Sequence, residues 1–107
     1  MAGCPCDMGR IMAIADKHGI AVLEDCAQCN GGSFGGKKVG TFGSIGMFSF
    51  QINKNVTAGE GGVIVTDDDE LYLRAVALHD LGIPWKNGEP DAHSGVSVVW
   101  SSPSSRW

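Results

Sequence analysis

The sequence predicts an α/β fold, because a helical pattern, three apolar runs typical of strands and a second helical pattern follow one another along residues 7–80. Residues 7–18 carry apolar side chains at spacings of three and four, which indicates an amphipathic helix. Asp7 is suited to cap the start of this helix, and Gly19 is suited to end it. With 107 residues, the chain is long enough for one small domain with a single core.

Three apolar segments predict the strands of the sheet. Residues 20–23 form an uninterrupted apolar run, as expected of a strand that is buried on both faces of a parallel sheet. Residues 45–50 form a second strand, which we expect to run parallel to the first. Residues 63–66 follow a short glycine turn, so this third strand is expected to be antiparallel to the second. Between the first two strands, Gly35-Gly36 indicates a small hairpin.

A second helix is predicted to begin in the acidic run at residues 67–70 and to extend to about Asp80. Acidic side chains in the first turn of a helix are stabilised by the helix dipole, which explains this run without a metal site. We assign residues 1–82 to one structural unit. Residues 83–107 show no sustained period, and a linker, a disordered tail and a truncated or non-native sequence are all open for this segment.

The composition excludes some classes of function. The formal net charge is −4 and the basic residues are scattered, which argues against a nucleic-acid-binding surface. No apolar run approaches the roughly 18 residues that a membrane span requires. No secretory signal is present at the N-terminus, so we expect a cytoplasmic protein that has no membrane partner.

The four cysteines form one C-x-C pair, Cys4 and Cys6, and one C-x-x-C pair, Cys26 and Cys29. Two such pairs are able to make a four-thiolate zinc site, so a metal or redox protein is one alternative. The C-x-C pair is an awkward metal knuckle, and the second pair directly follows a predicted buried strand. The sequence therefore favours free cysteines that behave as small apolar residues, and no metal site.

Candidate ligand-binding side chains follow two of the predicted strands. Asp25 and Gln28 follow the first strand, and Ser49 and Lys54 lie at and after the end of the second. Ligands of open α/β sheets bind outside the carboxyl ends of the strands. A carboxylate, an amide, a hydroxyl and an amine at one edge suit pyridoxal phosphate, whose aldehyde needs a lysine and whose pyridinium nitrogen needs an acidic partner.

Several segments occur in the order and at the spacing of a known family. They are residues 24–28 (EDCAQ), 39–43 (VGTFG), 48–50 (FSF) and 54–62 (KNVTAGEGG), with residues 5–8 (PCDM) before them and 79–82 (HDLG) after them. Through these segments the chain resembles the DegT/DnrJ/EryC1/StrS sugar aminotransferases over about residues 3–82. The resemblance implies a fragment of the large domain of a fold-type-I pyridoxal-phosphate-dependent transferase, with a mixed, mostly parallel sheet and flanking helices.

The resemblance also implies a role for each candidate residue. Lys54 would be the catalytic residue, which holds the cofactor covalently and moves a proton between substrate and cofactor. Asp25 would pair with the pyridine nitrogen, and Gln28 would lie against the ring. Ser49 would donate a hydrogen bond to the phosphate.

For the parent protein, the resemblance implies transfer of an amino group from glutamate or glutamine to a nucleotide-linked keto-sugar or a keto-cyclitol. It also implies a homodimer whose subunits share each active site. Family segments that complete the phosphate site and the substrate pocket have no counterpart in these 107 residues, so we expect the chain alone to be inactive. A binding module without catalysis is the main alternative.

Overall fold

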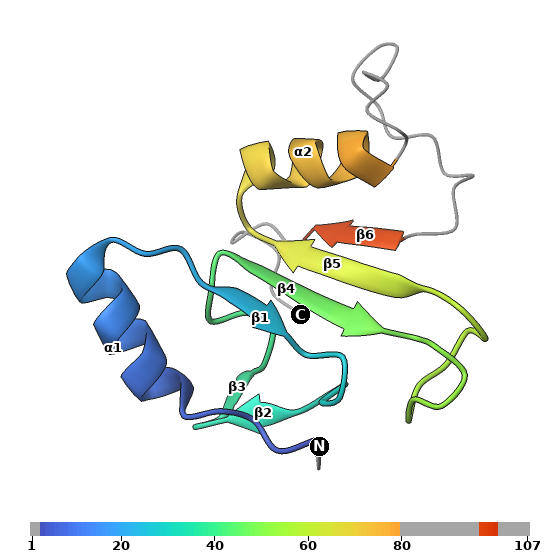
Figure 1. The fold of residues 1–107 in the computed structure, drawn as a ribbon, viewed down its shortest axis with the longest axis horizontal. Helices are drawn as coiled ribbons and strands as arrows, with labels where there is room; N and C mark the ends of the chain where they lie inside the picture. The colour runs from blue at the N-terminus through green and yellow to red at the C-terminus, as the bar shows by residue number, and fades with distance from the viewer. Residues whose placement is uncertain (1–2, 80–96, 101–107) are drawn as a thin grey trace.

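The computed structural model describes residues 3–79 and 97–100 (Figure 1). Within these residues the chain forms a four-stranded sheet in the order β1-β4-β5-β6, a separate hairpin of β2 and β3, and two helices. The elements are α1 (Met8–His18), β1 (Leu23–Asp25), β2 (Ser33–Phe34), β3 (Lys37–Lys38), β4 (Ile45–Ser49), β5 (Gly62–Thr66), α2 (Asp69–His79) and β6 (Ser97–Trp100). This arrangement confirms the α/β class.

The directions of the strands are those expected from the sequence. β1 pairs in parallel with β4, with Leu23 opposite Ile45, and β4 pairs antiparallel with β5. The hairpin at Gly35-Gly36 is also confirmed, and both glycines have a positive φ, as a tight two-residue turn requires. β6 pairs in parallel with β5 and lies in the segment to which the sequence analysis assigned no structure.

The predicted position and burial of the first strand were wrong. The strand comprises residues 23–25 and not 20–23, and Ile20 and Leu23 are 61% and 57% exposed. Among the described residues β1 lies at the edge of the sheet, with a paired neighbour on one side only. The polar residue Glu24 is the buried member of the strand, because its carboxylate finds hydrogen-bond donors there.

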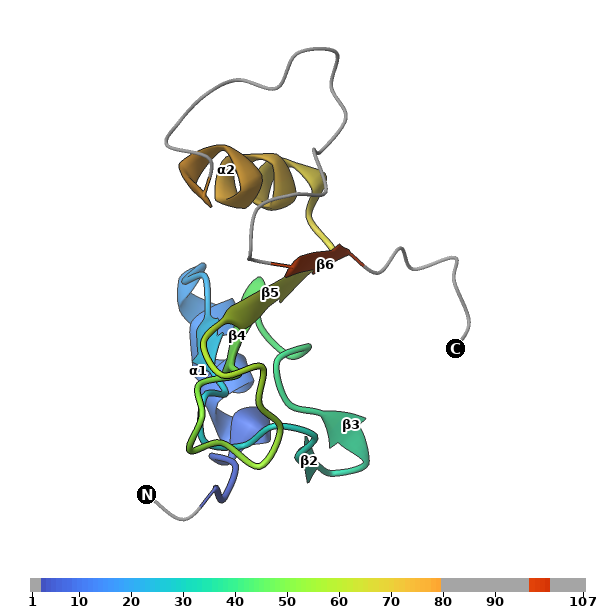
Figure 2. The same cartoon turned by 90° about the vertical axis from the view of Figure 1, so that its right-hand side faces the viewer.

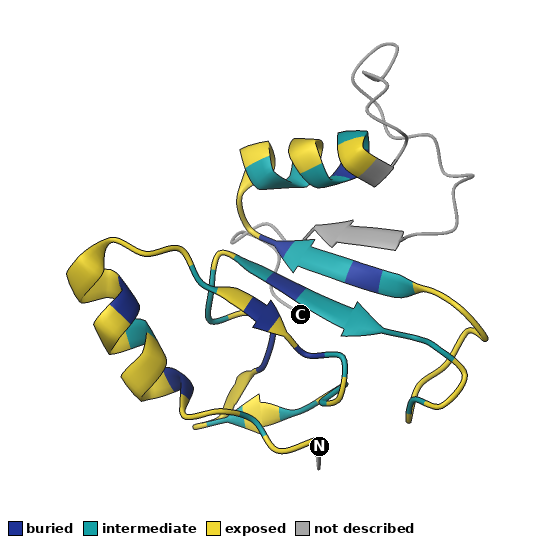
Figure 3. Ribbon diagram, viewed as in Figure 1, coloured by how far each residue is buried: buried dark blue, intermediate teal, exposed yellow. Residues whose placement is uncertain are grey.

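Both ends of α1 agree with the sequence. The Asp7 Oδ1 atom accepts a hydrogen bond from the Arg10 N–H at 3.1 Å, and Gly19 ends the helix with a φ of 62°. The expected apolar stripe is only partly covered, because Met8 and Ala15 are buried whereas Ile14 is 60% exposed. Figure 3 shows the same division, with α1 mostly exposed and the buried positions on one side of it.

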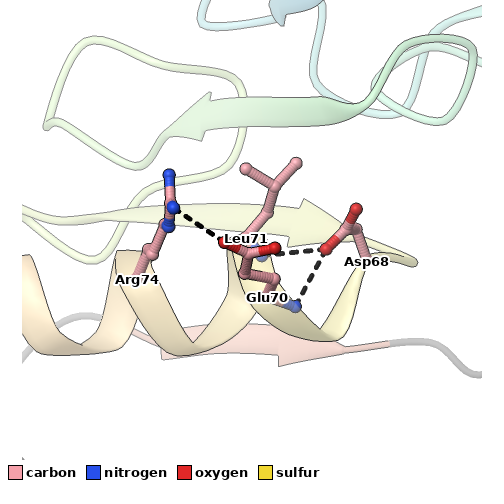
Figure 4. A network of polar contacts seen from close by, with 4 residues as sticks. All are labelled: Asp68, Glu70, Leu71 and Arg74. Atoms are coloured by element: carbon pink, nitrogen blue, oxygen red, sulfur yellow. Dashed lines mark hydrogen bonds and ion pairs between the residues drawn. The ribbon is translucent and has the colours of Figure 1, made fainter.

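The acidic run opens α2, as the sequence predicts: Asp69 and Glu70 lie in its first turn, and Asp68 caps it. The Asp68 Oδ1 atom accepts hydrogen bonds from the N–H groups of Glu70 and Leu71, and Glu70 forms an ion pair with Arg74 at 2.7 Å (Figure 4). The helix begins at Asp69, within the predicted acidic run, and the predicted end at Asp80 lies outside the described residues. α2 lies beside β5 and β6, whereas α1 lies near the β1 edge of the sheet (Figures 1 and 2). Neither helix in the described part of the chain is long and apolar enough to cross a membrane.

The connection from β3 to β4 is organised around the buried carboxylate of Glu24. Its Oε2 atom accepts a hydrogen bond from Gly40 N–H at 2.7 Å. Its Oε1 atom accepts from Phe42 N–H at 2.6 Å and from Gly43 N–H at 2.7 Å. Because Glu24 precedes Asp25, this network also fixes the end of β1 from which the candidate site begins.

Candidate functional site

The candidate residues lie at one edge of the sheet because β1 and β4 are parallel. Asp25 is the last residue of β1 and lies opposite Met47, and Ser49 is the last residue of β4. The N–H of Cys26 donates to the Met47 carbonyl at 2.9 Å, which continues the pairing one residue beyond Asp25. The carboxylate and the hydroxyl that sequence reasoning selected therefore follow neighbouring strands at the same sheet edge.

A cavity of about 470 Å³ brings Gln28 and Lys54 together. Its lining comes from the N-terminal stretch, the turn after β1 and the loop after β4: Gly3, Ala27, Gln28, Cys29, Asn30, Gly32, Asn53, Lys54 and Asn55. A Cβ atom on Gly3 would lie 2.6 Å from the Gln28 carbonyl oxygen, so the wall beside Gln28 requires a glycine. The volume lies within the ~300–1,000 Å³ that small-molecule sites occupy.

Lys54 is half-buried and is carried by a loop that is hydrogen-bonded to itself. The Lys54 N–H donates to the Gln51 carbonyl at 2.9 Å, and the Asn53 N–H donates to Gln51 Oε1 at 2.8 Å. At the base of the loop, the Phe50 carbonyl accepts from Ala58 N–H at 2.9 Å. These bonds give the lysine-bearing loop, residues 50–59, a defined shape close to the sheet.

Asp25 and Ser49 lie outside the lining of this cavity. Asp25 is exposed and lines a neighbouring cavity of about 300 Å³, and Cys29 lines both cavities. The Asp25 Oδ1 atom accepts from Ala27 N–H at 3.0 Å, which sets the direction of its side chain. Ser49 Oγ accepts a long hydrogen bond of 3.4 Å from Gln51 N–H and lines neither cavity. The roles assigned to these four residues stay predictions.

Sequence reasoning missed two asparagines that join the parts of the site. The Asn30 Nδ2 atom donates to the Ser49 carbonyl at 2.8 Å, and the Asn55 Nδ2 atom donates to the Asn30 carbonyl at 3.2 Å. Asn30 precedes a glycine, and an Asn-Gly pair is typical of a turn whatever the function. Nothing local in the sequence therefore distinguishes Asn30 from an ordinary turn residue.

The four cysteines are free thiols with different environments. Cys4 and Cys6 are exposed, Cys29 is half-buried and Cys26 is buried. Within residues 3–79 and 97–100, no group of three or more His, Cys, Asp or Glu side chains is arranged to hold a metal ion. The described part of the chain thus offers no geometric support for the zinc alternative.

Burial, together with the nearby Glu24 carboxylate, raises the pKa of the Cys26 thiol from 9.0 to about 11. The unfolded chain therefore loses this proton at a lower pH than the folded chain. We expect the free energy of unfolding to fall as the pH rises from 9.0 to about 11, and urea denaturation at several pH values measures this slope. The variant Cys26→Ala should show a shallower fall, and an identical slope in both proteins would contradict the assignment to Cys26.

A family model of known proteins matches most of the chain. The model described as the DegT/DnrJ/EryC1/StrS aminotransferase family matches residues 1–98. The chain belongs to this family. The resemblance inferred from the motifs is therefore confirmed, and the match extends beyond the residues 3–82 on which that resemblance was based.

Individual members of the family resemble the chain in sequence and in structure. The GDP-perosamine synthase of Escherichia coli O157:H7 is 47% identical over 81 residues, which are 76% of this chain and 22% of that protein. The L-glutamine:2-deoxy-scyllo-inosose aminotransferase of Streptomyces kanamyceticus is 45% identical over 84 residues, 78% of this chain and 20% of that protein. The aminotransferase from Psychrobacter cryohalolentis superposes with a TM-score of 0.76 at 41% identity, over all of this chain and 25% of that one.

These comparisons confirm that the chain has the fold of one part of a fold-type-I aminotransferase domain. The chain spans about a fifth of the length of the curated relatives that it matches. Aminotransferases of this family depend in general on pyridoxal phosphate.

Proposed function

We propose that this chain is the lysine-bearing part of a pyridoxal-phosphate-dependent aminotransferase. The complete protein would transfer an amino group from glutamate or glutamine to a nucleotide-linked keto-sugar or a keto-cyclitol. The observation that carries the proposal is the shared cavity of Gln28 and Lys54, at the sheet edge where Asp25 and Ser49 end neighbouring strands. Relatives named for a GDP-linked sugar and for a cyclitol support this substrate class.

The donors at this edge suit the cofactor. Lys54, whose side chain ends in a primary amine, is half-buried and lines a cavity of about 470 Å³. An amide side chain lines the same cavity, and a carboxylate whose direction is set by Ala27 N–H follows the neighbouring strand. A cationic ring nitrogen, a hydroxyl and a phosphate each find a group of complementary charge or hydrogen-bonding type among them.

Each of the four residues has a distinct task in this proposal. Lys54 holds the cofactor and moves a proton to and from the substrate carbon. Asp25 keeps the ring nitrogen protonated through its negative charge, and Gln28 orients the ring from the turn after β1. Ser49 contributes one hydrogen bond to the phosphate. The bound cofactor supplies an electrophilic carbon for the amino group and a cationic ring that accepts an electron pair.

Capture of the cofactor on a single lysine tests the proposal. The purified chain is incubated with pyridoxal phosphate, reduced with borohydride, digested and mapped by mass spectrometry. We expect Lys54 to carry most of the label, because this residue lines a cavity, whereas Lys37 and Lys38 are exposed. Weak binding is sufficient for this readout, because reduction traps the adduct.

Two variants make the result specific. Lys54→Ala should lose the selective label, and Lys38→Ala should keep it, because Lys38 donates to the Gly31 carbonyl and does not line the cavity. Equal labelling of Lys37, Lys38 and Lys54 would contradict a cofactor pocket formed by these residues. It would instead favour the module without catalysis.

The catalytic role of Lys54 is tested in a complete protein. The segment of the E. coli GDP-perosamine synthase that matches this chain is replaced by the corresponding residues of this chain. We expect the hybrid to transfer an amino group to a nucleotide-linked keto-sugar and to lose this activity on Lys54→Ala. Activity that survives this substitution would contradict the catalytic role. We also propose that the complete protein is a cytoplasmic homodimer, and sedimentation of the hybrid reports its oligomeric state.

A further inference from the structure

Asn30 occupies a junction between three parts of the site. It lies in the turn after β1, and its side-chain Nδ2 atom donates to the Ser49 carbonyl at the end of β4. Its own carbonyl accepts from the side chain of Asn55, the residue that follows Lys54. The two partners are 19 and 25 residues away in the sequence, so both contacts are tertiary. We call this pair of hydrogen bonds the Asn30 tether.

The two residues that Asn30 contacts lie on either side of Lys54 in the sequence. Ser49 precedes the lysine-bearing loop, and Asn55 lies within it. The internal bonds of that loop, such as Lys54 N–H to the Gln51 carbonyl at 2.9 Å, define its shape. They do not define its position relative to the turn after β1, because both of their ends lie in the same loop. The tether links the loop to that turn, and the turn also carries Gln28.

The Asn30 side chain also has a feature that is unfavourable for folding, so a gain in stability does not explain it. Its Oδ1 atom is buried and, among the described residues, has no hydrogen-bond partner. The amide cannot be turned over to relieve this, because the Ser49 carbonyl accepts and does not donate, so Nδ2 must face it. An unpaired buried acceptor is unfavourable, and an unsatisfied polar group in a folded protein calls for a specific explanation.

We infer that Asn30 is a positioning residue for Lys54, which it holds at a fixed place opposite Gln28 in their common cavity. The donor bond to Ser49 and the accepted bond from Asn55 together connect the two walls that carry the amide and the amine. The consequence for amino transfer rests on the proposed function. The geometric role does not, because it concerns the position of the amine before any ligand enters.

Competitive acetylation measures this position without a cofactor. The full chain is exposed to a trace of acetic anhydride, and the acetylation of Lys54 is expressed relative to Lys37 and Lys38 in the same molecules. We expect Asn30→Ala and Asn55→Ala each to raise this ratio about fivefold, the factor that corresponds to one ordinary hydrogen bond. The ratio should rise because Lys54 is half-buried and a released loop exposes more of its side chain.

Two controls separate positioning from a general loss of stability. Val56 is the residue after Asn55 in the same loop; it is 55% exposed and does not line the cavity, so Val56→Ala changes the loop without removing a bond of the tether. Val76→Ala removes a buried side chain of α2, which lies against β5 and β6, and lowers stability without touching the tether. Both variants should keep the wild-type ratio under conditions in which all the variants are folded.

The proposed role of the tether is overturned if Asn55→Ala gives the same ratio as Val56→Ala. This comparison is decisive even if Asn30→Ala does not fold, because Asn55 is exposed and its replacement removes a single surface hydrogen bond. A chain that responds to Asn55→Ala but takes up no pyridoxal phosphate at Lys54 would support the tether and contradict the proposed function. The two ideas therefore fail through different measurements.

Discussion

Replacement of Glu24 by glutamine is expected to lower the free energy of unfolding by about 3 kcal/mol. The buried carboxylate accepts three backbone hydrogen bonds, from Gly40, Phe42 and Gly43. Glutamine has nearly the same shape, but one of its two terminal atoms is an NH₂ group that would face an N–H donor. At least one backbone donor would then be buried without a partner, and the charge that strengthens the other bonds would be lost. Urea denaturation followed by circular dichroism measures the change.

Glu60→Gln is the matched control for this substitution. Glu60 is exposed, and the same chemical change there should alter stability by less than about 0.5 kcal/mol. Equal losses for the two variants would mean that the Glu24 network contributes nothing specific. A large loss at Glu24 alone would show that this carboxylate holds the connection between β3 and β4 against the sheet.

Alanine at Gly46 is expected to destabilise the chain by about 3 kcal/mol, through overpacking. Gly46 is the residue of β4 that lies opposite Glu24. A Cβ atom there would lie 2.3 Å from the Gly40 carbonyl oxygen and 2.5 Å from the Gly40 Cα atom. Both are backbone atoms, which do not move aside as a flexible side chain does. β4 needs a glycine at this position because the Gly40 backbone packs directly against it. The hydrogen bond from Gly40 N–H to Glu24 Oε2 holds Gly40 in that place.

The same substitution at Gly9 should have the opposite sign. Gly9 lies in α1, and a Cβ atom there meets its nearest neighbour, Asp7 Oδ1, at an ordinary 3.5 Å. Alanine favours the helix over glycine, so Gly9→Ala should raise the free energy of unfolding by about 0.5 kcal/mol. Thermal melting of both variants checks the prediction. A Gly46→Ala protein as stable as the wild type would show that Gly40 does not pack on β4 as described.

The structural features that are set by residues close by in the sequence were predictable. The α1 cap at Asp7, the stop at Gly19 and the hairpin at Gly35-Gly36 each follow from a side chain or a glycine within a few residues of the position concerned. The strand directions also agree with the prediction, although residues 50–61 join β4 to β5, which is a longer connection than the short glycine turn that was expected. The family motifs then selected Asp25, Gln28, Ser49 and Lys54 as candidates.

Burial along β1 was not predictable from hydropathy. An apolar run was the strongest local signal for a buried strand, yet Ile20 and Leu23 are exposed and Glu24 is buried. The reversal arises because the N–H groups that compensate the Glu24 carboxylate come from residues 16 to 19 positions further along the chain. β6 was missed for a related reason, since four residues form a strand there through pairing with β5 and not through a pattern of their own.

The candidate site shows the same contrast between what nearby residues determine and what contacts between distant residues determine. The sequence was sufficient to identify the family and the sheet edge at which the candidate residues lie, because ordered motifs and parallel strands carry that information. Only the tertiary structure showed that Gln28 and Lys54 share a cavity and that Asn30 joins its walls. Those relations depend on how the turn after β1 and the loop after β4 fold against each other. Contacts between segments this far apart in the sequence leave no local pattern from which to predict them.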